Sequence, residues 1–105
     1  MLQTNAKLTR VFRHYQPVFN ALGNPTRQQI MFLLANNKQL SVIELAAKTS
    51  LSRPTISHHL KILSDARLVR AKQAGVRTYY APAFETPLGM AQDFVATLEK
   101  YVNRG

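Results

Sequence analysis

Apolar residues near the amino end of the chain recur at steps of three and one, a spacing that predicts one buried face of a helix. The pattern keeps its phase across Pro17. Because proline removes a backbone donor and clashes with the preceding turn, we expect this helix to kink or break briefly near Gln16. The apolar residues of this stretch are Leu8, Val11, Phe12, Tyr15, Val18, Phe19 and Leu22.

A second helix is predicted just after Gly23, where the first segment ends. Asn24 is a good N-cap and Pro25 suits the first helical position, so the helix should begin there. It should end near residues 36–37. Its buried face is predicted to comprise Ile30, Leu33 and Leu34, flanked by Met31 or Phe32.

Residues 41–66 have the pattern of two short helices joined by a tight turn, which is a helix-turn-helix. Ser41 and Glu44 match a capping box, in which each side chain bonds the backbone N–H of the other residue. After a turn at residues 49–51, Ser52 should cap the second helix, and Pro54 falls in its first turn. The predicted inward residues are Val42, Leu45 and Ala46 in the first helix and Ile56, Leu60 and Leu63 in the second.

Two β-prone runs follow at residues 68–72 and 77–81, with Ala74 and Gly75 at the bend between them. They predict a short hairpin, or wing, within residues 67–82. A last amphipathic helix is expected to start at Thr86 and Pro87. Its apolar stripe comprises Ala91, Phe94, Val95, Leu98, Tyr101 and Val102.

These elements predict a single domain over residues 1–105, mainly α with a small β-hairpin, in the order α-α-α-α-β-β-α. A short extra strand near Leu40 is an open alternative. The order is typical of a winged helix-turn-helix, a fold that docks one helix in the major groove of double-stranded DNA.

The charge of the chain indicates a polyanionic partner. Its 14 lysines and arginines against five acids give a formal net charge of +9. A domain this basic usually meets a polyanion, because counterions released from phosphates drive binding. From Lys48 to Arg77 there are seven basic residues and one acid, Asp65, so the charge is concentrated in the predicted helix-turn-helix and wing.

The outward face of the helix predicted at residues 52–66 carries side chains suited to reading DNA. At about 100° per residue, Ser57, His58 and Lys61 lie opposite the apolar side. Their hydroxyl, imidazole and ammonium groups can donate hydrogen bonds to phosphates and base edges. His59 lies nearer the interior, where we expect it to be half-buried. The predicted DNA-binding residues are Ser52, Arg53, Thr55, Ser57, His58, Lys61, Lys72 and Arg77.

Four motifs occur together in register. Residues 21–27 read ALGNPTR, residues 52–63 read SRPTISHHLKIL, and the strands contain ARLV at 66–69 and GVRTYY at 75–80. With this combination, the stretch from Phe19 to Pro82 closely resembles the ArsR/SmtB family of bacterial winged-helix repressors.

The resemblance implies a homodimeric transcriptional repressor that binds an imperfect palindrome through the 52–66 helix and the 68–81 wing. The first and last helices, within residues 1–22 and 87–103, would form the dimer interface. The interface residues would be Leu8, Val11, Phe12, Tyr15, Phe94, Val95, Leu98, Tyr101 and Val102.

The sensor sites of the resembling family are not expected in this chain. It contains no cysteine, which excludes disulfides, thiolate metal sites and thiol sensing within it. Zinc- and nickel-sensing members carry Asp and His pairs on the last helix, whereas this one has Asp93 and Glu99 without histidine. We therefore predict no metal and no cofactor. A small-molecule effector near Phe12, Tyr15 and Phe94 and control by abundance alone are both open alternatives.

The main competing function keeps the fold and changes the partner, giving a winged-helix module that binds a protein or RNA. An enzyme is not indicated, since the chain lacks paired carboxylates, a nucleophile with a placed base and a Gly-rich phosphate loop. No apolar run approaches the roughly 18 residues of a membrane span, and residues 1–10 lack the apolar core of a secretory signal. We expect a cytoplasmic protein.

Overall fold

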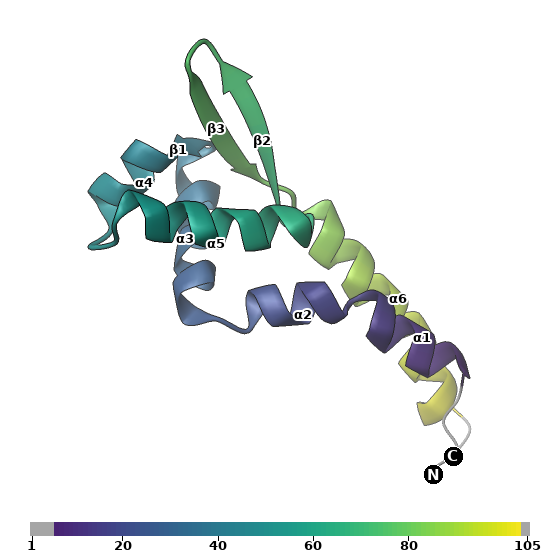
Figure 1. The fold of residues 1–105 in the computed structure, drawn as a ribbon. Helices are drawn as coiled ribbons and strands as arrows, with labels where there is room; N and C mark the ends of the chain where they lie inside the picture. The colour runs from purple at the N-terminus through teal and green to yellow at the C-terminus, as the bar shows by residue number, and fades with distance from the viewer. Residues whose placement is uncertain (1–5, 104–105) are drawn as a thin grey trace.

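The computed structural model describes residues 6–103, so residues 1–5 of the predicted dimerisation segment 1–22 lie outside the described part of the chain, as do residues 104 and 105. Figure 1 shows a β-hairpin that projects from a group of helices, with α1 and α6 extending together to one side. The elements are α1 (Ala6–His14), α2 (Gln16–Leu22), α3 (Pro25–Asn37), β1 (Leu40–Ser41), α4 (Val42–Lys48), α5 (Arg53–Asp65), β2 (Val69–Ala74), β3 (Arg77–Pro82) and α6 (Glu85–Val102).

The predicted fold class is confirmed. The order matches the sequence prediction, with the first helix divided in two and the extra strand present at Leu40 and Ser41. The division falls at Tyr15, next to Gln16, where a break is predicted, and Pro17 lies in the first turn of α2. The Tyr15 N–H still donates to the Val11 carbonyl at 3.1 Å, which explains why the apolar phase survives the break.

Side-chain caps set the starts of three helices, as the sequence predicts. The Arg27 N–H donates to Asn24 Oδ1 at 3.0 Å at the start of α3. At α4 the capping box is complete, with the Glu44 N–H donating to Ser41 Oγ at 3.2 Å and the Ser41 N–H donating to Glu44 Oε1 at 2.9 Å. Ser52 caps α5 by accepting from the N–H of Thr55 at 3.3 Å. These caps define the register of α5, the helix predicted to read DNA.

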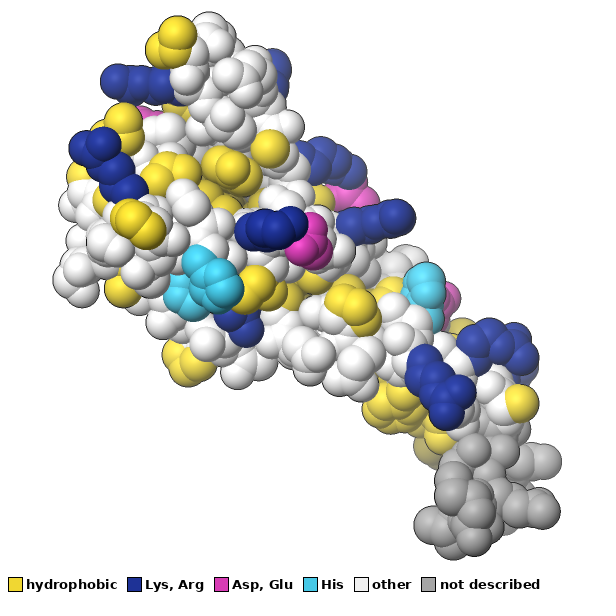
Figure 2. All heavy atoms as spheres, in the orientation of Figure 1, with side chains coloured by type: hydrophobic (Ala, Val, Ile, Leu, Met, Phe, Trp, Pro, Cys, Tyr) yellow, Lys and Arg dark blue, Asp and Glu magenta, His cyan; other side chains and the backbone are white. Residues whose placement is uncertain are grey.

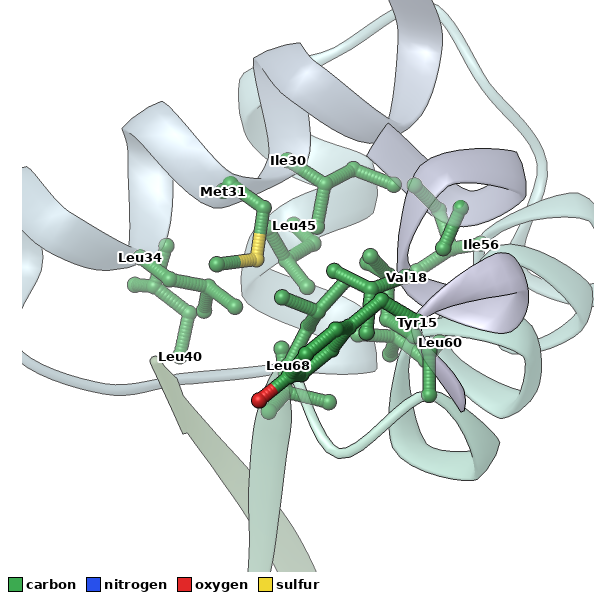
Figure 3. Close-up of a cluster of buried hydrophobic side chains, with 14 residues drawn as sticks. Tyr15, Val18, Ile30, Met31, Leu34, Leu40, Leu45, Ile56, Leu60 and Leu68 are labelled. Atoms are coloured by element: carbon green, nitrogen blue, oxygen red, sulfur yellow. The ribbon is translucent and has the colours of Figure 1, made fainter. Parts of the chain in front are cut away.

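The hydrophobic core lies where α2, α3, α4 and α5 meet the base of the hairpin (Figure 3). The inward residues predicted for α4 and α5 are confirmed, since Leu45, Ile56 and Leu63 have no exposed surface. In α3 the flanking residue that packs inward is Met31, whereas Phe32 is exposed. The largest fully buried side chains are Ile30, Leu34, Leu45, Ile56, Leu60, Leu63 and Leu68.

The sheet has the order β1-β3-β2 and is antiparallel throughout. The hairpin strands run longer than the predicted 68–72 and 77–81, because Ala74 pairs with Arg77 and moves the loop to Gly75 and Val76. Gly75 has a φ of 65°, while Val76 is not among the residues with positive φ. Positive φ at the first loop position alone is the pattern of a type II′ turn, which matches the twist of the strands.

Candidate nucleic-acid interface

The outward face of α5 presents polar side chains to solvent, while its inner face is locked in the core. Ile56, Leu60 and Leu63 hold the helix by its buried side. Figure 2 shows histidine and basic side chains over α5 on the face turned to the viewer. All eight predicted DNA-binding side chains are exposed, namely Ser52, Arg53, Thr55, Ser57, His58, Lys61, Lys72 and Arg77. An exposed polar face on a rigidly anchored helix is what insertion into a major groove requires.

Two of these residues also shape the start of α5. The Ser52 hydroxyl donates to the hydroxyl oxygen of Thr55 at 2.9 Å while it caps the helix. Arg53 is the first residue of the helix and is exposed. The amino end of α5 is therefore ordered by Ser52 and Thr55, and the guanidinium of Arg53 extends from it into solvent.

Lys61 makes an ion pair within α5. Its ammonium lies 3.3 Å from the carboxylate of Asp65, one turn further along, and both side chains are largely exposed. Exposed pairs of this kind contribute about 0–1 kcal/mol, so the lysine can exchange Asp65 for a phosphate at little cost. The ion pair is compatible with a DNA contact at Lys61.

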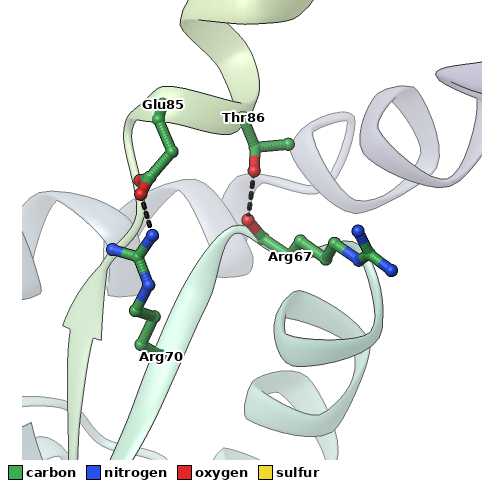
Figure 4. A network of polar contacts seen from close by, with 4 residues as sticks. All are labelled: Arg67, Arg70, Glu85 and Thr86. Carbon is green, nitrogen blue, oxygen red and sulfur yellow. Dashed lines mark hydrogen bonds and ion pairs between the residues drawn. The ribbon is translucent and has the colours of Figure 1, made fainter.

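The three basic residues of the wing strands lie on one face of the hairpin but differ in their contacts. Lys72 and Arg77 are exposed, as predicted. Arg70 instead forms an ion pair with Glu85 at the start of α6 (Figure 4). Beside it, the Thr86 hydroxyl donates to the carbonyl of Arg67 at 2.7 Å. Arg70 and Thr86 thus tie the base of the wing to α6.

His59 is half-buried, as predicted, but it lies against a side chain that the sequence prediction missed. Its Nδ1 is 3.4 Å from the guanidinium of Arg27. Arg27 also donates to the carbonyls of Ala21 and Asn20, at 2.9 and 3.2 Å. Burial, and then the charges of Arg27 and His58, lower the pKa of His59. Arg27 therefore links the end of α2 to the inner side of α5, a contact between residues 32 positions apart that no local pattern could reveal.

The terminal helices α1 and α6 pack against each other through aromatic side chains. The ring of Phe94 contacts Phe12, Tyr15 and Phe19 at centroid distances of 5.0, 6.1 and 5.4 Å. The Tyr15 hydroxyl donates to the carboxylate of Asp93, and this bond raises the pKa of Tyr15. Tyr15 is thus buried within the subunit, and Asp93 is already engaged.

The predicted interface residues leave a large apolar surface uncovered. Within the described residues, α1 has no buried side chain and α6 buries Thr97 alone. Leu8, Val11 and Phe94 are half-buried, in contrast to the buried Tyr15. The exposed members are Phe12, Val95, Leu98, Tyr101 and Val102, with exposed fractions of 46%, 58%, 43%, 37% and 77%.

The described residues hold no group of three or more His, Cys, Asp or Glu side chains that could bind a metal ion. Over the same part of the chain, every helix is too short or too polar to cross a membrane.

Residues 24–71 match the model of the bacterial regulatory protein arsR family. The arsenical resistance operon repressor of Bacillus subtilis is 32% identical over 72 residues, which cover 69% of each chain. The transcriptional repressor SdpR of Bacillus subtilis is 31% identical over 88 residues, covering 84% of this chain and 92% of that protein.

The fold of this chain is similar to a solved structure, the homodimeric winged helix-turn-helix DNA-binding domain of a possible ArsR-family regulator from Mycobacterium bovis. Its TM-score is 0.70 at 28% sequence identity, and the match covers 94% of this chain and 92% of that domain.

Proposed function

We infer the function from one premise, that this chain belongs to the ArsR family of bacterial regulatory proteins. It is a transcriptional regulator with a winged helix-turn-helix that binds DNA, and it is not an enzyme. The structural observation that best supports DNA binding is the polar outward face of α5, a helix that its buried inner face fixes to the core.

We propose that the chain acts as a homodimeric repressor. The exposed apolar side chains of α1 and α6 support this, because exposed apolar side chains gathered on two packed helices often mark a protein interface. The related domain from Mycobacterium bovis is homodimeric. A second copy placed against α1 and α6 would cover Phe12, Val95 and Leu98 and would bring two α5 helices to one side of the dimer.

In this proposal each α5 enters a major groove of an imperfect palindrome, with half-site centres about one helical turn, or roughly 34 Å, apart. Ser57, His58 and Lys61 would face base edges and phosphates, and the wing residues Lys72 and Arg77 would contact the flanking backbone or minor groove. Ser52, Arg53 and Thr55 would contact the backbone at the amino end of α5. Because an operator is its target, we place the protein in the cytoplasm.

We propose that this chain does not respond to arsenic through thiolate ligands. Arsenic binds thiolates, and this chain has no cysteine, so such a site cannot form within it. Any effector would be a small molecule, and the aromatic contact of Phe12, Tyr15 and Phe94 is the place we would look for it.

A gel-shift titration against the DNA upstream of the chain's own gene tests the proposal. Lys61→Ala and Arg77→Ala should each weaken binding, and the salt dependence of log K should fall by about 0.9 for each phosphate that the variant no longer neutralises. Arg70→Ala is the charge-matched control, because Arg70 lies at the base of the wing beside the start of α6, whereas Lys72 and Arg77 lie further toward its tip.

Two results would contradict parts of the proposal. An unchanged slope in both variants would remove Lys61 and Arg77 from the interface. Equal affinity for all duplexes together with tight binding to one protein or RNA would favour the alternative function.

A further inference from the structure

The polar face of α1 carries two arginines that the proposed DNA contacts do not use. Arg10 and Arg13 are three residues apart and exposed, and neither guanidinium makes a hydrogen bond or an ion pair within residues 6–103. At about 100° per residue they lie opposite the apolar stripe that begins with Leu8 and Val11. The stripe packs toward α6, so Arg13 lies on the outer side of α1, while Arg10 also borders a hollow that α1 forms with α6.

Basic residues outnumber acids around these arginines, although Asp93 lines the same hollow as Lys7 and Arg10. Helix α1 has no acidic residue. At the edge of the same surface, the ammonium of Lys100 in α6, then burial and then the charge of Arg10 lower the pKa of Lys7, while the charge of Asp93 acts in the opposite direction. The carboxylate of Asp93 accepts the bond from Tyr15 and offsets part of this positive charge. A bound anion would reduce the repulsion between these positive charges, so this face favours anion binding.

The surface of α1 is continuous with the end of α5. A hollow along α1 is lined by Thr9, Arg10, Arg13 and His14. His14 also lines a second hollow, which reaches Asp65 and Arg67 at the carboxyl end of α5. Figure 2 shows basic and histidine side chains over both α5 and α1 on one face of the molecule. The exposed side of α5 and the basic side of α1 therefore face the same way.

We propose that this basic face of α1 binds the phosphate backbone of the operator between its two half-sites, with Arg10 and Arg13 as the phosphate-binding residues. The inference rests on the proposed function, since a dimer formed through α1 and α6 places these helices between the two α5 helices. Guanidinium groups suit the role, because they donate two parallel hydrogen bonds to phosphate oxygens.

The test is a thermodynamic cycle between arginine and phosphate. An operator obtained by selection from random duplexes is made in two forms, one natural and one with neutral methylphosphonates replacing the phosphates at its centre. The wild type, Arg10→Gln, Arg13→Gln and the control Arg70→Gln are titrated with each form over a range of salt concentrations. Sedimentation establishes that every variant is a dimer.

On the natural operator, each of the two α1 variants should lower the salt slope by about 1.8, because each subunit of the dimer then neutralises one phosphate fewer. On the neutralised operator, the wild type and the α1 variants should share one reduced slope. Arg70→Gln should follow the wild type on both forms.

Three results would overturn the inference. If both α1 variants keep the wild-type slope while the wild type binds its operator, the α1 face is not a phosphate site, although the proposed function stands. The α1 face is likewise not a phosphate site if the variants reduce the salt slope equally on both operators, and the proposed function again stands. If the α1 variants become monomeric, the arginines serve the subunit interface instead. A wild type that binds no operator rejects the proposed function itself.

Discussion

Replacing Arg67 by glycine is expected to stabilise the protein, because Arg67 occupies a backbone conformation that glycine prefers. Its φ is 59°. It ends α5 in a Schellman motif, in which the Arg67 N–H donates to the Ser64 carbonyl at 2.9 Å and the Leu68 N–H donates to the Leu63 carbonyl at 2.8 Å. These two bonds join backbone atoms, and the hydroxyl of Thr86 donates to the backbone carbonyl of Arg67. Glycine at position 67 therefore preserves all three bonds.

The size of the effect follows from two opposing contributions. A side chain in the left-handed region costs roughly 1–2 kcal/mol, while glycine loses about 0.5–1 kcal/mol more conformational entropy on folding. The net gain should be about 0.5–1 kcal/mol, which raises the Tm of a domain this size by about 3–5 °C.

Thermal unfolding at one fixed chain concentration measures this gain, since dimer stability depends on concentration. Arg67→Ala is the control, because it removes the guanidinium but keeps the Cβ atom at positive φ. The reasoning is refuted if Arg67→Gly is no more stable than Arg67→Ala.

Two further predictions concern the dimer and the capping box. Val95→Glu combined with Leu98→Glu should give a folded monomer in sedimentation, whereas Phe32→Glu, an exposed apolar residue of α3, should leave the dimer intact; a dimeric double variant would contradict the interface. Ser41→Ala should lower the free energy of unfolding by about 1 kcal/mol in denaturant titrations. Bonds from Ser41 lower the pKa of Glu44 below its ordinary value near 4.5, so the stability that this carboxylate contributes is complete above that pH and is lost as the pH falls through the lowered value. Glu44→Gln should remove that part of the pH dependence, and an unchanged acid limb in Glu44→Gln would show that Glu44 does not contribute to it.

Local chemistry made the helix starts and the orientation of α5 predictable. Asn24, Ser41 and Ser52 were recognisable as caps because a cap bonds within three residues of itself. The exposure of Ser57 and His58 followed from helical periodicity, which tertiary packing then preserved.

Features that depend on distant partners could not be predicted. Tyr15 and Asp93 are 78 positions apart, and Arg70 meets Glu85 only because β3 returns the chain to the base of the wing, where α6 begins. The last helix begins at Glu85 rather than at Thr86, a difference of one residue that Pro87 allows because proline is tolerated in the first turn.

Footprinting of the operator by hydroxyl radicals tests the central claim most directly. The claim is that two copies of this chain read one palindrome through their α5 helices. It predicts two protected segments with centres about one helical turn apart, bound by one dimer and abolished by scrambling the half-sites. Protection that spreads evenly along the duplex, with equal affinity for the scrambled sequence, would contradict it.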